Sequence, residues 1–158
     1  MKKELTTELV TEYPDQSKVW LYQADRALTE DERKFIDLKL EEFVGEWAAH
    51  GNKLYGVGKT VNPYFIMIAV NDTLAPPSGC SVDASVHFLK ELGATLNVDF
   101  FTRMRVTIEE EEEIKQINFS DLENHKDALI YDPLITSVGD FKQGWPRPIA
   151  SSNFAQAV

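Results

Sequence analysis

The stretch Tyr64-Phe65-Ile66-Met67-Ile68-Ala69-Val70 decides the fold, because it is the longest apolar run in the sequence. It has the length of one strand and is far shorter than the roughly 20 apolar residues that a membrane span needs. A strand that is apolar at every position is typical of a central strand covered on both faces. The sequence therefore predicts a sheet built around residues 64–70.

A helix is predicted after Thr29-Glu30-Asp31-Glu32, which has the pattern of a capping box. In this motif the threonine hydroxyl and the Glu32 carboxylate each accept a hydrogen bond from an otherwise unpaired backbone amide. Glycine can adopt the left-handed conformation that ends a helix, so we expect this helix to end near His50-Gly51. Its expected core face, at helical spacing, consists of Ile36, Leu40, Phe43 and Trp47.

A second long helix is predicted from about Ser81 to Gly93. Its apolar residues again recur at helical spacing, and the expected core face consists of Val82, Val86 and Leu89. Glycine at position 93 is expected to stop the helix.

Further elements are predicted on both sides of these helices. Residues 18–23 are rich in strand formers, and residues 103–108 alternate between polar and apolar, which favours a half-exposed strand. A capping-box pattern at residues 120–123 predicts a short helix, and residues 131–136 are expected to form an edge strand because Pro133 lacks a ladder donor.

Length and pattern together predict a single α+β domain spanning residues 1–158. We expect a mixed sheet of four or five strands with the two main helices packed on one face. Residues 1–17 lack periodicity and are expected to form a loose lead-in, and residues 139–158 are expected to form an irregular tail.

The formal net charge of −10 argues against nucleic acid or an anionic membrane as the main partner, because phosphate contacts need clustered lysine and arginine. A single cysteine is typical of a reducing compartment. No apolar run follows the two lysines at the N-terminus, as a signal peptide would require. We therefore expect a cytoplasmic protein without a membrane span.

The segment Gly56-Val57-Gly58-Lys59-Thr60 ends like a nucleotide-binding loop. A complete phosphate-binding loop has a glycine six residues before the lysine, at the position of Lys53 here, and opens a helix. The chain has neither feature, so we interpret the segment as a flexible turn and expect no ATPase activity.

The segment Ser78-Gly79-Cys80-Ser81 contains the only cysteine, at the expected start of the second helix. Unpaired amides and the helix dipole favour negative charge there, which suits a reactive thiolate or a bound anion. A nucleophilic Cys80 would need His50 or His125 as a base, because His87 lies about two helical turns, roughly 10 Å, away. The same separation excludes a zinc site shared by Cys80, Asp83 and His87, and we expect no bound metal or other cofactor. The alternative is structural, with Ser81 capping the helix and Cys80 buried as a small apolar residue.

The chain also resembles a small, uncharacterised bacterial family whose members are often labelled "ABC transporter ATPase". The resemblance covers residues 18–108 and implies no catalytic residue. The label conflicts with this sequence, which lacks a complete Walker A motif and an ABC signature and is too short for a nucleotide-binding domain. The stretches that support the resemblance are Trp20-Leu21-Tyr22-Gln23, Arg26-Ala27-Leu28-Thr29, Trp47-Ala48-Ala49-His50-Gly51, residues 78–85 and Phe88-Leu89-Lys90-Glu91-Leu92.

Three functions follow as hypotheses. The first is a non-enzymatic binding or interaction domain for a protein or a small anionic ligand, because no complete catalytic set is visible. The second is a cysteine-dependent enzyme that uses Cys80 with His50 or His125. The third is a small-anion or nucleotide-binding protein that uses Ser78, Gly79, Cys80 and Ser81.

Overall fold

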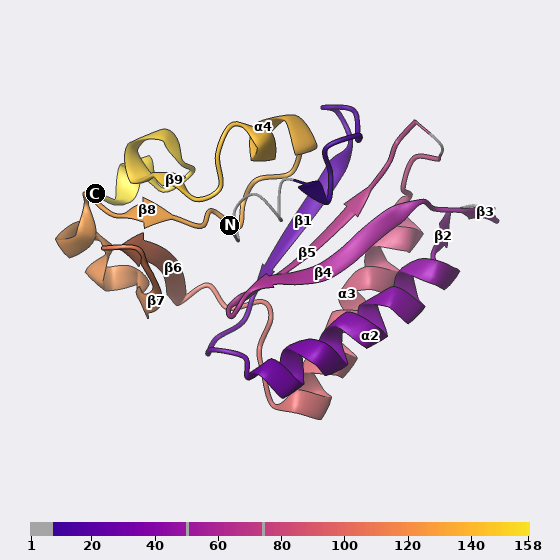
Figure 1. Cartoon of the computed structure of the whole chain (residues 1–158), viewed down its shortest axis with the longest axis horizontal. Helices are drawn as coiled ribbons and strands as arrows, with labels where there is room; N and C mark the ends of the chain where they lie inside the picture. The colour runs from indigo at the N-terminus through magenta and orange to yellow at the C-terminus, as the bar shows by residue number, and fades with distance from the viewer. Residues whose placement is uncertain (1–7, 50, 74) are drawn as a thin grey trace.

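Strand β5 (Phe65–Val70) is the middle strand of a three-stranded antiparallel sheet, between β1 (Lys18–Gln23) and β4 (Gly56–Asn62). Every residue of β5 is buried, which confirms the predicted central strand. The structure is a computed structural model that describes residues 8–49, 51–73 and 75–158 (Figure 1).

The two faces of β5 pack against different layers, as the alternation of side chains along a strand requires. Ile66, Ile68 and Val70 belong to the core beneath helices α2 (Glu30–Glu46) and α3 (Gly79–Leu96), which lie side by side on one face of the sheet (Figure 1). Phe65, Met67 and Ala69 belong to a second core on the opposite face. The α+β class, with both main helices on one face, is therefore as predicted.

Helix α2 begins as expected but ends earlier. The Thr29 amide donates to Glu32 Oε1 at 2.9 Å, and the Glu32 amide donates to Thr29 Oγ1 at 3.1 Å, which completes the capping box. Trp47 has extended backbone angles and lies beyond the last turn. The reason is tertiary, because the Trp47 indole N–H donates to the Ser81 carbonyl at 2.8 Å and residue 48 starts a short hairpin, β2 (Ala48–Ala49) with β3 (Asn52–Lys53).

Helix α3 is longer than predicted at both ends. It runs through Gly93, whose missing side chain lets the backbone of Val98 approach closely, and it ends at Asn97, which takes the left-handed conformation at φ 57°. Its buried residues are Ser81, Ser85, Leu89, Leu92 and Gly93, so the core face is rotated from the predicted one and Val82 and Val86 are only half-buried.

The strands form several antiparallel sheets rather than one mixed sheet of four or five strands. The second main sheet has the order β7-β6-β8-β9, with β6 (Arg105–Glu110), β7 (Glu113–Asn118), β8 (Leu129–Ile130) and β9 (Arg147–Pro148). The prediction failed because residues 56–62 form a strand that pairs with β5 through a tight hairpin. The first helix therefore leads from β1 to an edge strand, not to β5.

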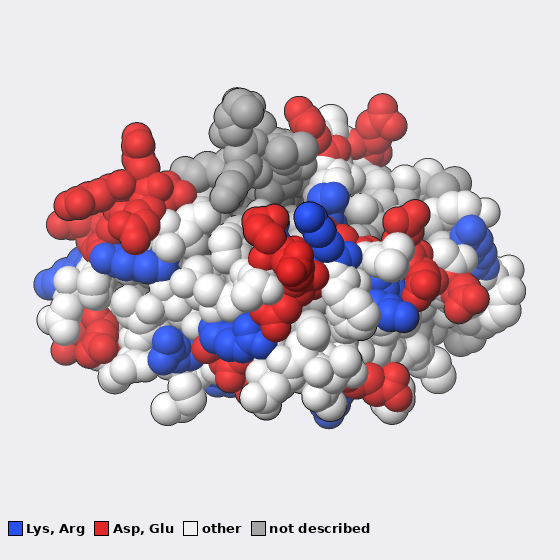
Figure 2. Space-filling view, turned by 60° about the horizontal axis from the view of Figure 1, so that its bottom comes forward, with Lys and Arg blue, Asp and Glu red and all other residues white. Residues whose placement is uncertain are grey.

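The acidic run 109–113 spans the end of β6, the two-residue turn Glu111-Glu112 and the start of β7. Glu111 and Glu112 have φ values of 52° and 64°, the backbone pattern of a type I′ turn. The short helix predicted after residue 120 is present as a 3-10 helix, η1 (Phe119–His125), but it has no side-chain cap and ends before residue 129. The edge strand predicted at residues 131–136 is not present, since β8 ends at Ile130. Figure 2 shows a dense group of acidic side chains at the end of the molecule where Figure 1 places β6 and β7.

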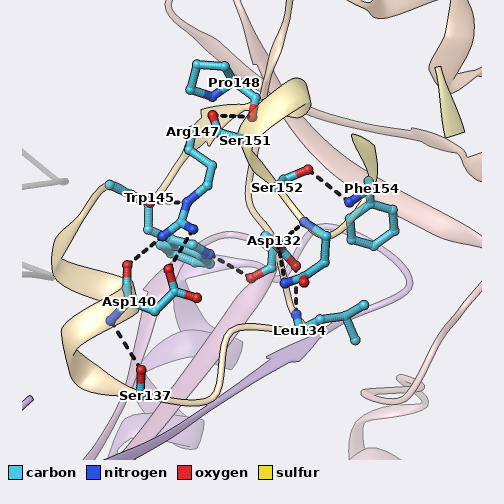
Figure 3. Close-up of polar contacts among 12 residues, drawn as sticks. Asp132, Leu134, Ser137, Asp140, Trp145, Arg147, Pro148, Ser151, Ser152 and Phe154 are labelled. Carbon is cyan, nitrogen blue, oxygen red and sulfur yellow. Dashed lines mark hydrogen bonds and ion pairs between the residues drawn. The ribbon is translucent and has the colours of Figure 1, made fainter. Parts of the chain in front are cut away.

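The predicted irregular tail is ordered and covers the second core. It contains helix α4 (Val138–Lys142), β9 and two short 3-10 helices, η2 (Ile149–Ser151) and η3 (Ala155–Ala157). Arg147 donates to Asp140 Oδ1 at 2.8 Å and to the Gly144 carbonyl at 2.7 Å (Figure 3). Trp145 is buried against Phe65 and donates to the Asp132 carbonyl at 3.0 Å. These contacts explain why the tail is part of the fold.

The described part of the expected loose lead-in, residues 8–17, packs against the fold. Val10 and Ser17 are fully buried, and Leu9 and Tyr13 pack against the second core. Residues 1–7 of that prediction lie outside the described residues. Within the described ranges, no helix has the length and apolar character to cross a membrane.

Truncation of β5 tests the role of its two buried faces. We expect Ile68→Ala and Met67→Ala each to lower the free energy of unfolding by about 2–5 kcal/mol, because each leaves a cavity in a different core. Leu38→Ala is the control, since Leu38 is 57% exposed, and we expect a change within about 0.5 kcal/mol. Denaturant unfolding measures all three; a cost below about 1 kcal/mol on either face would contradict the two-core arrangement.

The Arg26–Glu32 pair predicts a pH dependence of stability. Arg26 binds both Glu32 oxygens, at 2.9 and 2.8 Å, and also the Leu96 carbonyl at the end of α3. The Arg26 guanidinium, followed by the Thr29 amide, lowers the pKa of Glu32 to about 2. A carboxyl with a lowered folded-state pKa stabilises the protein above its unfolded-state pKa and loses this effect as the pH falls toward its folded-state pKa.

We therefore expect Glu32→Gln to lower the free energy of unfolding at pH 7 by about 1 kcal/mol, a modest value because Arg26 is partly exposed. The difference from the wild type should shrink between roughly pH 5 and pH 2. Unfolding titrations across this range measure it, with the exposed Glu41→Gln as the control. A difference that stays constant down to pH 2 would contradict the assignment.

Candidate functional site

The start of α3 is capped by Ser78, not by Ser81 as predicted. The Ser81 amide donates to Ser78 Oγ at 3.2 Å, and the Ser78 amide donates to Ser81 Oγ at 2.7 Å. Both hydroxyls are therefore used inside the cap, and Ser81 is buried. Of the segment 78–81, only Gly79 and Cys80 retain amides without a cap partner, so the cap itself already satisfies much of what an anion would bind.

Cys80 is exposed, which corrects the expectation of a buried thiol. The prediction failed because the helix starts at Gly79, so Cys80 falls on its outer face while Ser81 and Ser85 face the core. Within the described ranges, no hydrogen bond or ion pair reaches the thiol.

The histidines proposed as bases are not brought to Cys80 by the described part of the chain. His125 lies on η1, where its Nδ1 is 2.9 Å from Glu110 Oε2. Cys80 lies at the start of α3, a helix that contacts β2. Figure 1 places β2 and η1 at opposite ends of the molecule. His50 lies outside the described residues. His87 pairs with Glu91 on the outer surface of α3. Among the described residues, no cluster of three or more His, Cys, Asp or Glu side chains is placed to hold a metal ion.

The segment 56–60 is part of strand β4, which corrects its interpretation as a flexible turn. Gly58 faces α2, where a Cβ would lie 3.2 Å from Leu40 Cδ2 and 3.3 Å from Val44 Cγ2. A side chain at position 58 would make these contacts tighter than usual, so glycine helps the helix to pack closely on the strand. At position 56 a Cβ would collide with the Ala69 carbonyl of β5, so the two glycines follow from close packing inside the fold.

A cleft of about 800 Å³ lies along β4. Among the residues that the structure describes, β4 is an edge strand, since in the order β1-β5-β4 it has a neighbour on one side only. Leu38 and Tyr55, which are 57% and 48% exposed, are large apolar side chains of this cleft. The lining comes from α2 (Lys34, Asp37, Leu38, Glu41, Val44, Gly45), from residues 53–59, and from Leu9, Tyr13 and Asn71.

The backbone of β4 presents hydrogen-bonding groups to this cleft. Along an antiparallel strand, the N–H and C=O of successive residues point alternately toward the partner and away from it. The Tyr55 carbonyl accepts from the Asn71 amide beside β5, whereas the Thr60 amide points away from β5 and donates to Asp37 Oδ1 at 2.7 Å. The same alternation directs the N–H and C=O groups of Gly56 and Gly58 away from β5, and both residues line the cleft.

The charge around the cleft differs from that of the whole chain. Lys34, Lys53 and Lys59 line it, and within the described ranges none of them forms an ion pair with a carboxylate. Of the two acidic lining residues, Asp37 accepts two hydrogen bonds from Thr60. Three lysines without a carboxylate partner among the described residues make the cleft a local exception on a chain of net charge −10, and the Lys53 ammonium lies over the Tyr55 ring, 5.7 Å from its centroid.

Cysteine-specific alkylation tests the position of Cys80. We expect the native protein to react with iodoacetamide at a rate within about threefold of the urea-unfolded chain, because the thiol is exposed and unpaired. Cys80→Ser should change the free energy of unfolding by less than about 0.5 kcal/mol. Mass spectrometry follows the adduct; protection by more than tenfold in the native state would contradict an exposed Cys80.

The site is therefore defined by backbone edge groups, exposed apolar side chains and lysines, none of which forms a sequence motif. The predicted site residues 78–81 lie at the start of α3 and do not line the cleft. The glycines and lysines of residues 53–59 are visible in the sequence, but their spacing suggests a phosphate-binding loop, and only the strand β4 relates them to a cleft. Searches of protein-family models, curated proteins and solved structures found no match to this chain.

Proposed function

We propose that the chain is a non-enzymatic binding domain that takes up an extended segment of a protein partner as an additional strand on β4. The supporting observation is the pair of outward-facing backbone groups at Gly56 and Gly58 along the cleft. An open strand edge offers a peptide main-chain hydrogen bonds, and neighbouring pockets select its side chains.

The lining favours a partner segment with both acidic and apolar side chains. Lys34, Lys53 and Lys59 attract carboxylates, and Leu38 and Tyr55 offer apolar contacts. Opposite charges across an interface speed association and exclude wrong partners. The segment is therefore expected to alternate acidic and apolar residues.

Catalysis by Cys80 has less support, since among the described residues no base lies within hydrogen-bond distance of its thiol. An anion site at residues 78–81 also has less support, because Ser78 and Ser81 bond to each other's amides. We also propose that the protein works in the cytoplasm, as its single cysteine favours. Membership of the bacterial family that it resembles remains part of the proposal, without the ATPase label, because the Gly-Lys-Thr segment lies in a strand.

Peptide selection followed by hydrogen exchange tests strand addition. We expect a random peptide library to yield acidic, β-forming ligands, and a bound ligand to slow amide exchange at Gly56 and Gly58 by at least about tenfold, because these amides become hydrogen-bonded. NMR exchange measurements resolve the two glycines. Selected peptides that are basic, or that bind without protecting either amide, would contradict strand addition.

The charge contribution has its own variants. The double variant Lys53→Glu/Lys59→Glu should weaken peptide binding by about tenfold or more at low salt. Lys39→Glu is the matched control, because Lys39 lies on α2 but outside the cleft, and it should change affinity by less than about twofold.

A further inference from the structure

A second cavity, of about 430 Å³, lies beside β1 and contains two arginines. It shares no lining residue with the β4 cleft. Its arginines are Arg103, in the connection that follows α3, and Arg105, at the start of β6.

These two arginines are distinguished by their lack of carboxylate partners. Arg26 pairs with Glu32, Arg33 with Glu30, and Arg147 with Asp140. Within the described ranges, the Arg103 side chain forms no hydrogen bond or ion pair. The Arg105 side chain forms one hydrogen bond there, from Nη1 to Asn118 Oδ1 at 3.3 Å. The Nε atom of Arg105 is buried without a hydrogen-bond partner. An unsatisfied buried donor is costly, so this group indicates a missing acceptor.

The remaining walls of this cavity are largely apolar and aromatic. Tyr22 and Phe101 form an edge-to-face pair with ring centroids 5.6 Å apart, and Phe119 and Phe154 form a tilted pair with ring centroids 6.0 Å apart. Leu134 and Phe119 are 44% and 38% exposed, although both are large apolar side chains. Flat apolar walls with a few polar groups are typical of small-molecule sites, and the volume lies in their usual range.

The polar network of the tail holds two of these walls in place (Figure 3). The fully buried Asp132 accepts from the Leu134 amide at 2.8 Å and from the Asn153 amide and side chain, each at 2.9 Å. Leu134 and Phe154, next to Asn153, both line the cavity. The walls are therefore fixed by the fold before any ligand binds.

The edge of β1 contributes backbone N–H and C=O groups to this cavity, between two positions where the edge is already bonded. The Val19 amide donates to the Thr136 carbonyl, and Gln23 forms a bridge with Phe101. By the strand alternation, Leu21 points its N–H and C=O to the same side as Val19, and Leu21 lines the cavity. These groups can orient a polar substituent of a ligand.

We infer that this cavity binds a small organic carboxylate with a flat apolar body. Arg103 and Arg105 would bind the carboxylate, for which the planar guanidinium is suited, and the aromatic walls would pack against the body. On a chain of net charge −10, an anion needs such a local pair of unpaired cations to bind.

The probe is 1-naphthoate, with the uncharged 1-naphthamide as its matched ligand control. Calorimetric titration should show that naphthoate binds at least about tenfold more tightly than naphthamide, and that Arg103→Gln and Arg105→Gln each reduce this preference by about fivefold or more. Lys39→Gln removes the same charge outside both cavities and should leave both affinities unchanged within about twofold.

Leu134→Trp fills the cavity and should weaken both ligands. Arg103→Gln keeps the test valid if Arg105→Gln is unstable, because Arg103 is exposed and forms no described contact. Equal binding of naphthoate and naphthamide, unchanged naphthoate binding in both arginine variants or in Leu134→Trp, or a tenfold preference for 1-naphthyl phosphate over naphthoate would each overturn the inference.

Discussion

Burial of β5 on both faces is the constraint on which the rest of the structure depends. A strand buried on both sides needs two separate apolar layers, and one chain of this length must supply both. The long helices α2 and α3 supply the first layer. The second comes from residues 9–13 of the N-terminal segment and from the C-terminal tail, whose residues Trp145 and Phe141 belong to the same core as Phe65 and Met67.

This constraint also explains which edges of the sheet remain open. The segment that leads into the tail reaches β1, where the Thr136 carbonyl accepts from the Val19 amide and Ser137 forms a bridge with Lys18. On the far side, α2 packs on the face of β4, and the hydrogen bonds that it makes to the strand edge in the described part of the chain lie at Thr60, whose amide donates to Asp37 and whose carbonyl accepts from Arg33. The two proposed sites therefore arise where one sheet is incompletely covered at opposite edges.

Local sequence signals predicted local structure well. The capping box at Thr29 depends on residues three positions apart, and the strand at residues 64–70 depends on its own composition, so both were predicted from sequence. The end of α2 was not, because the indole N–H of Trp47 bonds to Ser81, 34 positions away. Strand β4 was also missed, since glycine has a low intrinsic strand preference and Gly58 is required only because α2 packs on it.

The candidate site shows the same division more sharply. Cys80 drew attention because a lone cysteine at a helix start has a recognised chemistry, yet its surroundings decide reactivity and lie beyond local sequence. The groups that define the β4 cleft are backbone amides and carbonyls, which every residue carries and no motif marks. The pairing of β4 with β5 is what shows that the backbone N–H and C=O groups of Gly56 and Gly58 point away from β5.

Charge distribution reconciles an acidic chain with two sites that favour anionic ligands. Charges at the protein surface are screened over about 8–10 Å at physiological salt, so remote carboxylates have little influence on a local site. A dense acidic group lies at the end of the molecule that carries β6 and β7, where residues 109–113 form the tip of their hairpin (Figure 2). Lys53 and Lys59 line the cleft beside β4, and Arg103 and Arg105 lie beside β1 without carboxylate partners among the described residues. The net charge of −10 therefore does not oppose binding of a single carboxylate at either edge of the sheet.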